Sequence, residues 1–141
     1  MVSSIELEIV FKLILAAFLG GLIGYERQIH KKPAGLRTHT LICIGATLFT
    51  IVSISFVGAS DPSRIASGIV TGIGFLAAGL IFRAEDHVRG LTTATELWVL
   101  AAIGIAIGIG FYYVAIVTTI IVLVILVPMK YFEEKTMKKK R

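Results

Sequence analysis

The sequence predicts an all-α, polytopic membrane protein with about five transmembrane helices, and three observations support this fold class. Of the 141 residues, 56% are hydrophobic and only 16% are charged, whereas about 25% of the residues in an average soluble domain are charged. The mean hydropathy is +0.89. The apolar residues are grouped into runs long enough for helices that cross a bilayer, which takes about 17–25 residues. We expect one transmembrane domain over residues 1–132 and a short basic cytoplasmic tail over residues 133–141.

Five apolar segments follow one another along the chain. We expect helices at residues 9–25, 40–57, 65–82, 94–109 and 111–127. The first segment contains Lys12, whose long side chain could extend to the nearer membrane surface. The apolar stretch from residue 97 to residue 131 is too long for one crossing. We place the turn that divides it near Gly110, because glycine permits the backbone conformations of tight turns.

The positions of the basic residues predict the orientation of these helices. Twelve of the fourteen Lys and Arg residues lie in the 21–40 loop, in the 83–91 loop or after residue 129. Cytoplasmic loops are enriched in Lys and Arg, so we expect the N-terminus outside and the C-terminus inside. The net charge of +5 does not indicate a nucleic-acid partner, because the basic residues separate apolar segments instead of forming one face of a soluble fold. The expected partner of the surface is the lipid bilayer.

Glycines recur with a spacing of four residues in three of the predicted helices. The pairs are Gly20 and Gly24, Gly68 and Gly72, and Gly104 and Gly108. Small residues at this spacing allow two membrane helices to approach closely, so the pattern predicts that the first, third and fourth segments form a compact centre. The fifth segment has no such stripe and is expected to face lipid. The alternative is that glycine is simply common in membrane helices.

Two acidic residues lie at predicted helix starts. Asp61 precedes a proline, which is typical of a helix N-cap, and a cation at the outer surface is the alternative role. Thr93 and Glu96 match a capping box, in which each side chain satisfies a backbone donor of the other residue. Glu96 also enters the membrane at the start of a glycine-rich helix, where an acidic side chain that faces the helix bundle is a candidate ion or proton site.

Charged residues of both signs are expected to meet near the inner membrane surface. If the helices pack as the glycines predict, Arg37 and Arg83 pair with Glu26 and Glu96. The alternative is a set of surface ion pairs that each contribute at most about 1 kcal/mol. The candidate polar cluster comprises Arg27, Arg37, Thr38, Arg64, Arg83, Arg89, Thr92, Thr93 and Glu96.

Enzymatic chemistry is not predicted. The three histidines have no metal-ligand spacing and the chain has one cysteine, Cys43, so a zinc site is not expected. The sequence contains neither a nucleophile elbow nor a phosphate-binding loop. No cofactor is predicted with certainty. Mg²⁺ prefers carboxylates, and Glu26 and Asp61 are its candidate ligands.

Three stretches resemble one known family when they are taken together. They are GLIGYERQIHKKPAGLRTHTLICIGATLFT, DPSRIASGIVTGIGFLAAGLIF and VRGLTTATELWVLAAIGIAIGIGFY. In order and spacing they closely resemble the membrane domain of the MgtC/SapB family, from about Gly20 to Tyr113. The characteristic polar positions of that family correspond to Glu26, Arg27, Gly35, Arg37, Thr38, Asp61, Arg64, Arg83, Arg89, Gly90, Thr92, Thr93 and Trp98.

The resemblance implies a bacterial inner-membrane protein of about five helices that is linked to magnesium homeostasis and, in pathogens, to survival inside host cells. Members are often labelled magnesium transporters. Others are thought to act on membrane proteins such as the ATP synthase or cation-pumping ATPases. Two departures from the family stand out. Many members carry a soluble domain after the fifth helix, and Glu96 takes a position usually filled by a neutral residue.

Three functional hypotheses follow. The first is a magnesium-homeostasis protein; if it moves or senses a cation, Glu26 and Asp61 are the expected ligands, with Arg37 as their charge partner. The second is a regulatory membrane protein that binds another membrane protein and passes no ion. The third is a scaffold that forms a homodimer.

Overall fold

The computed structural model describes residues 4–55, 61, 63–84 and 87–128. These residues form five helices and one two-stranded hairpin, so the predicted all-α class is confirmed. The elements are α1 (Ser4–Ile29), α2 (Leu36–Ser55), α3 (Ser63–Ala78), β1 (Phe82–Ala84), β2 (His87–Arg89), α4 (Leu91–Gly108) and α5 (Tyr112–Leu126).

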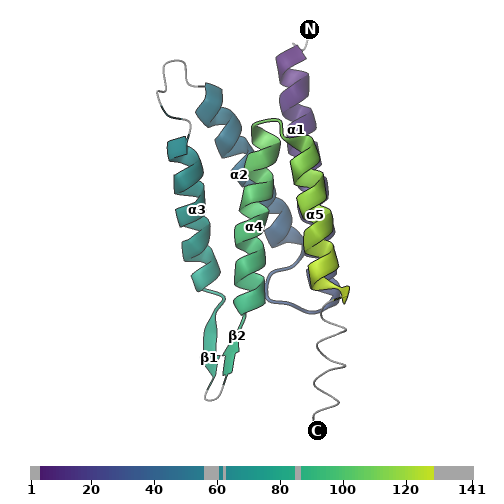
Figure 1. Cartoon of the computed structure of the whole chain (residues 1–141), viewed down its shortest axis with the longest axis vertical. Helices are drawn as coiled ribbons and strands as arrows, with labels where there is room; N and C mark the ends of the chain where they lie inside the picture. The colour runs from purple at the N-terminus through teal and green to yellow at the C-terminus, as the bar shows by residue number, and fades with distance from the viewer. Residues whose placement is uncertain (1–3, 56–60, 62, 85–86, 129–141) are drawn as a thin grey trace.

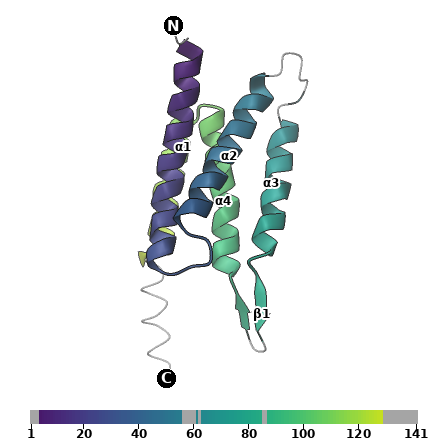
Figure 2. The same cartoon turned by 180° about the vertical axis from the view of Figure 1, so that it is seen from behind.

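The helices run along the long axis of an elongated bundle. Figure 1 shows α4 between α3 on one side and α1 with α5 on the other, and Figure 2 shows α2 crossing the far face of α4. The α1–α2 connection and the β-hairpin lie at one end of the bundle, which we call the hairpin end (Figure 1). The start of α1 and the α4–α5 turn lie at the other end, which we call the opposite end.

Three helices, α1, α2 and α4, are long and apolar enough to cross a membrane, by length and composition. The other two, α3 and α5, are apolar but only 16 and 15 residues long. The described chain is therefore a polytopic helical membrane protein. Its orientation in the bilayer stays a prediction.

The third helix is shorter than predicted, because the chain leaves the helix after Ala78 and forms the β-hairpin. Phe82 pairs with Arg89 in an antiparallel register. The hairpin leads into α4 through Gly90, which has a φ of +83°. A Cβ atom at this position would lie only 1.9 Å from the carbonyl oxygen of Leu80, so only glycine fits here.

The turn between α4 and α5 lies where the sequence predicts it. Gly110 has a φ of +91°. The amide of Phe111 donates to the carbonyl of Ala106 over 2.7 Å, and the amide of Gly110 donates to that of Ile107 over 3.0 Å. This pair of bonds is a Schellman motif, which satisfies the last carbonyls of a helix.

The centre of the bundle is formed by α1, α2 and α4, and not by the first, third and fourth segments as predicted. The glycines of α1 and α4 both approach α2. A Cβ at Gly20 would lie 2.7 Å from the Cβ of Cys43, and a Cβ at Gly104 would lie 2.7 Å from the Cβ of Ala46. Gly24 and Gly108 are equally close to α2, at His39 and Thr50.

The predicted packing role of Gly68 and Gly72 is wrong within this chain. A Cβ at either position would meet no atom within 4 Å. The small residues of α2 provide the tight contacts instead, and α3 lies at the edge of the bundle (Figure 1). The fifth helix buries one face through Ala115 and Thr119 and exposes the other. The exposed face agrees with the expectation that this helix faces lipid, and the buried face does not.

The side chain of Lys12 makes two contacts near the opposite end of the bundle. It is buried, its Nζ donates to the carbonyl of Gly108 over 3.1 Å, and it forms an ion pair with Glu8 at 3.0 Å. The carbonyl of Gly108 belongs to the last turn of α4, where carbonyls have no partner within the helix. Lys12 therefore caps α4 from α1.

Candidate functional site

Four buried side chains from three helices meet at the hairpin end. They are Glu26 and Arg27 of α1, His39 of α2 and Glu96 of α4, and we call them the buried polar cluster. Each is at most 7% exposed. Buried charges are stable in a protein only when they are paired, so the contacts among these four groups decide what the site can do.

Helix packing brings the cluster together. A Cβ at Gly24 would lie 2.8 Å from the Cβ of His39 and 2.8 Å from the Cα of Leu36. The missing side chain therefore lets the start of α2 rest directly on the last turns of α1. The same approach brings His39 and Arg27 to 3.3 and 3.4 Å from the carboxylate of Glu96.

Arg27 lies between the two carboxylates of the cluster. Its Nε donates to Oε2 of Glu26, and its Nη1 lies 3.4 Å from Oε2 of Glu96. The side chains of Arg27 and Glu96 are each 3% exposed. One guanidinium thus neutralises negative charge on two helices, a geometry for which its fork of donors is suited.

Two histidines complete the contacts. Nδ1 of His30 lies 2.8 Å from Oε1 of Glu26, and this side chain is about one-third exposed. Nε2 of His39 lies 3.3 Å from Oε1 of Glu96, and His39 is fully buried. A chain of ionisable groups therefore runs from the partly exposed His30 to the interior of the bundle.

The other ring nitrogen of His39 determines where protons can lie. Nδ1 is 2.9 Å from the carbonyl oxygen of Gly35, and because a carbonyl only accepts, Nδ1 carries a proton. Nε2, the other ring nitrogen, faces Oε1 of Glu96 at 3.3 Å.

The predicted pairing of Arg37 with the carboxylates is wrong. Arg37 and Thr38 are exposed on α2 and do not enter the cluster, and Arg27 takes the place expected for Arg37. The expected pairing of Arg83 concerns a side chain outside the described part of the structure. Three further predicted positions lie around the hairpin end, with Arg89 and Thr92 exposed and Thr93 buried.

Glu96 does not form a capping box. Helix α4 begins at Leu91, after Gly90, so Thr93 and Glu96 both lie inside the helix. The sequence around Thr93 fits a helix cap, but the helix begins two residues before Thr93, directly after the hairpin and Gly90. The alternative that the sequence leaves open, an acidic side chain facing the bundle, is the observed one.

The sequence pattern did not single out His39 as a member of the site. A usable signal was present, because His39, Cys43, Ala46 and Thr50 recur with helical spacing and share one face of α2. All four are buried. This polar and small face is the one that meets α1 and α4.

Asp61 and Arg64 lie at the opposite end of the bundle from Glu26, at the start of α3 (Figure 1). The carboxylate of Asp61 accepts hydrogen bonds from the amide and the hydroxyl of Ser63, at 2.9 and 2.5 Å, as expected for a helix cap. These bonds, first that from the hydroxyl and then that from the amide, lower the pKa of Asp61.

A magnesium site that combines Glu26 with Asp61 does not fit the structure, because the two carboxylates lie at opposite ends of the bundle. Within the described residues, no group of three His, Cys, Asp or Glu side chains could hold a metal ion. Mg²⁺ requires oxygen ligands and retained waters, whereas the space between Glu26 and Glu96 holds the guanidinium of Arg27.

Comparisons with known proteins agree with this architecture. The MgtC family model matches residues 13–135. The putative magnesium transporter YhiD of Escherichia coli (strain K12) is 48% identical over 128 residues, which is 84% of this chain and 59% of that protein. Protein MgtC of Brucella abortus (strain 2308) is 48% identical over 110 residues, 78% of this chain and 46% of the relative.

Protein MgtC of Salmonella typhimurium (strain LT2) is 46% identical over 114 residues, 81% of this chain and 49% of the relative. The chain thus spans about half the length of the curated relatives it matches. No solved structure matches.

Proposed function

Because this chain belongs to the MgtC family, we propose that it is a bacterial inner-membrane protein that serves magnesium homeostasis by acting on another membrane protein. The name of the Escherichia coli relative, a putative magnesium transporter, supports the link to magnesium. The resemblance of the membrane domain supports a membrane location. In this proposal no Mg²⁺ passes through the buried polar cluster.

One observation supports the proposal that no Mg²⁺ passes through the cluster and that the protein acts on another membrane protein. The guanidinium of Arg27 is buried between Glu26 and Glu96 and pairs with both. A divalent cation that entered this space would meet a fixed positive charge in a medium of low dielectric constant, where like charges repel strongly. The cluster is therefore better suited to joining α1, α2 and α4 than to coordinating Mg²⁺.

The exposed groups at the hairpin end supply a surface for a partner. Arg37 on α2 and Arg89 on β2 are both exposed, and Lys31 and Lys32 lie in the connection between α1 and α2. Beneath this surface the buried polar cluster joins α1, α2 and α4, which fixes the positions of these exposed groups. A partner that presents acidic groups near the membrane surface would complement them.

Two measurements on the same variants test this function. The first is growth at low Mg²⁺ of a bacterial strain that lacks its own family member and expresses this chain. The second is Mg²⁺ uptake by liposomes that contain the purified protein. We expect the wild-type chain to support growth and the Arg27→Gln variant, which breaks the buried polar cluster, to fail. Liposomes with wild-type protein should take up no more Mg²⁺ than empty ones.

Transport of Mg²⁺ is the second candidate function, and the name of the Escherichia coli relative favours it. Under this alternative, wild-type liposomes take up Mg²⁺ above the empty control, and neutralising a ligand by Glu26→Gln or Asp61→Asn reduces that uptake. Such a result would replace the regulatory proposal.

A further inference from the structure

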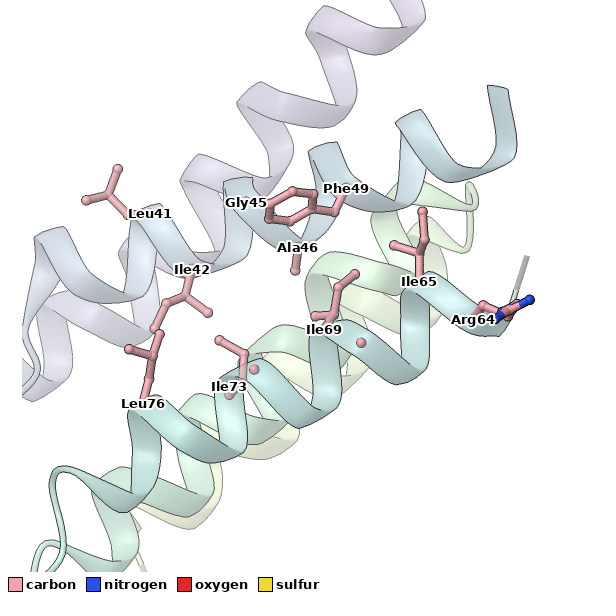
Figure 3. Close-up of a pocket in the computed structure, with 12 residues that line it drawn as sticks. Leu41, Ile42, Gly45, Ala46, Phe49, Arg64, Ile65, Ile69, Ile73 and Leu76 are labelled. Atoms are coloured by element: carbon pink, nitrogen blue, oxygen red, sulfur yellow. The ribbon is translucent and has the colours of Figure 1, made fainter. Parts of the chain in front are cut away.

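A groove between α2 and α3 is not part of the site described above. Its volume is about 670 Å³, and its walls are apolar side chains and glycines, with one cationic residue, Arg64, at one end. Figure 3 shows Ile42, Phe49 and Ile69 lining the groove from the two helices, and Arg64 at the start of α3, at one end of the groove. In the bilayer such a space has to be filled, because unfilled walls lose their packing contacts.

Packing among the described helices does not close the groove. A Cβ added at Gly45, Gly68 or Gly72 would meet no atom within 4 Å. All three glycines line the groove. The missing side chains therefore widen the space between α2 and α3 without bringing the two helices together, in contrast to the glycines that face α2 from α1 and α4.

The length of the groove matches one leaflet of a membrane. On α3 it extends from Arg64 to Leu76, twelve residues along the helix, which corresponds to about 18 Å at ~1.5 Å per residue. Half of the ~30 Å hydrocarbon layer is about 15 Å. The groove therefore has about the length that one acyl chain spans in its leaflet.

Arg64 lies where the headgroup of such a lipid would be. It is at the start of α3 and exposed, and it forms no ion pair with any other described residue. The nearby carboxylate of Asp61 is engaged by the amide and the hydroxyl of Ser63. A guanidinium binds phosphate through two parallel hydrogen bonds.

We propose that the α2–α3 groove is a binding site for an anionic phospholipid, with an acyl chain between the two helices and the phosphate at Arg64. The site is distinct from the buried polar cluster and does not depend on whether the protein transports or regulates.

Native mass spectrometry of the purified full chain, with phosphatidylglycerol and phosphatidylcholine of identical acyl chains as probes, tests this site. Arg64→Gln removes the charge, and Arg37→Gln, at the hairpin end, is its matched control. Gly72→Leu fills the groove, and Gly74→Leu is its control, since Gly74 also has open space around its Cβ position but lies outside this groove.

We expect the wild-type chain to retain one phosphatidylglycerol molecule in preference to phosphatidylcholine. Arg64→Gln should reduce the preference about fivefold, since a basic residue near anionic lipid contributes about 1 kcal/mol and about 1.4 kcal/mol is tenfold. Gly72→Leu should lower retention of both lipids. Neither control should change it. The thermal stability of Gly72→Leu should stay close to that of Gly74→Leu, because neither leucine replaces a packed contact.

Three results would overturn the proposal. The first is equal retention of the two lipids by the wild-type chain. The second is equal loss of lipid in the Gly72→Leu and Gly74→Leu variants, which would indicate a general lipid shell. The third is a dimer that the Gly72→Leu substitution dissociates, which would show that a second copy of the chain occupies the groove.

Discussion

Replacing Arg27 by glutamine tests the buried polar cluster most directly. The substitution keeps a side chain of similar reach and removes the positive charge between Glu26 and Glu96. Glu26 and Glu96 would then lose the buried positive charge that they share. Arg37→Gln is the matched control, because it makes the same chemical change at an exposed position of α2.

The distances in the structure set the expected size of the effect. At the observed 3.4 Å between Nη1 of Arg27 and Oε2 of Glu96, and with an effective dielectric constant of about 20, Coulomb's law gives an attraction of roughly 5 kcal/mol. Breaking a buried ion pair by removing one partner typically costs about 3–5 kcal/mol. We therefore expect Arg27→Gln to lower the free energy of unfolding by about 3–5 kcal/mol. Arg37→Gln should change it by less than about 0.5 kcal/mol.

Unfolding in mixed micelles with increasing SDS, followed by the fluorescence of the single tryptophan, Trp98, measures this difference. The double variant Arg27→Met with Glu96→Leu removes both the charge and one of its partners, so it should be more stable than Arg27→Gln. A loss below about 1 kcal/mol for Arg27→Gln, which is the size expected of a surface pair, would refute the assignment. So would a double variant that is no more stable than the single one.

Three further results are expected. Nitrogen-15 NMR should show a proton on Nδ1 of His39, as its hydrogen bond to the carbonyl of Gly35 requires; an unprotonated Nδ1 signal would contradict that bond. Gly104→Ala should lower the free energy of unfolding by about 1–3 kcal/mol through overpacking, whereas Gly68→Ala, measured in the same assay, should raise it or leave it unchanged. The stabilising contact of Asp61 should be present above the pKa of an unfolded aspartate and be lost as the pH falls through its lowered pKa; Ser63→Ala should return that pKa towards its ordinary value in an NMR titration.

The chemistry of the hairpin end could be predicted in part from the sequence. The pattern places Glu26, Arg27 and Glu96 as charged residues near one membrane surface. It does not identify their partners, because helix rotation decides them. Arg37 and His39 are two positions apart on α2, which at about 3.6 residues per turn places them about 200° apart around the helix. Only one of them can face α1, and in the structure that residue is His39.

The same reason applies to the glycines. All three pairs have the spacing that allows close approach, yet those of α1 and α4 meet α2, whereas Gly68 and Gly72 face an open groove. The spacing of small residues shows that a helix can be approached closely. It does not show whether another helix approaches that face.

The sequence alone determined the properties that depend on short segments. In a bilayer every backbone polar group has to be satisfied within its own helix, so apolar runs and turn glycines predicted the helical class and the turn at Gly110. The central position of α2, the burial of His39 and the space between α2 and α3 were decided only by the tertiary structure. They depend on which faces of distant segments meet, and that choice minimises the energy of all contacts together.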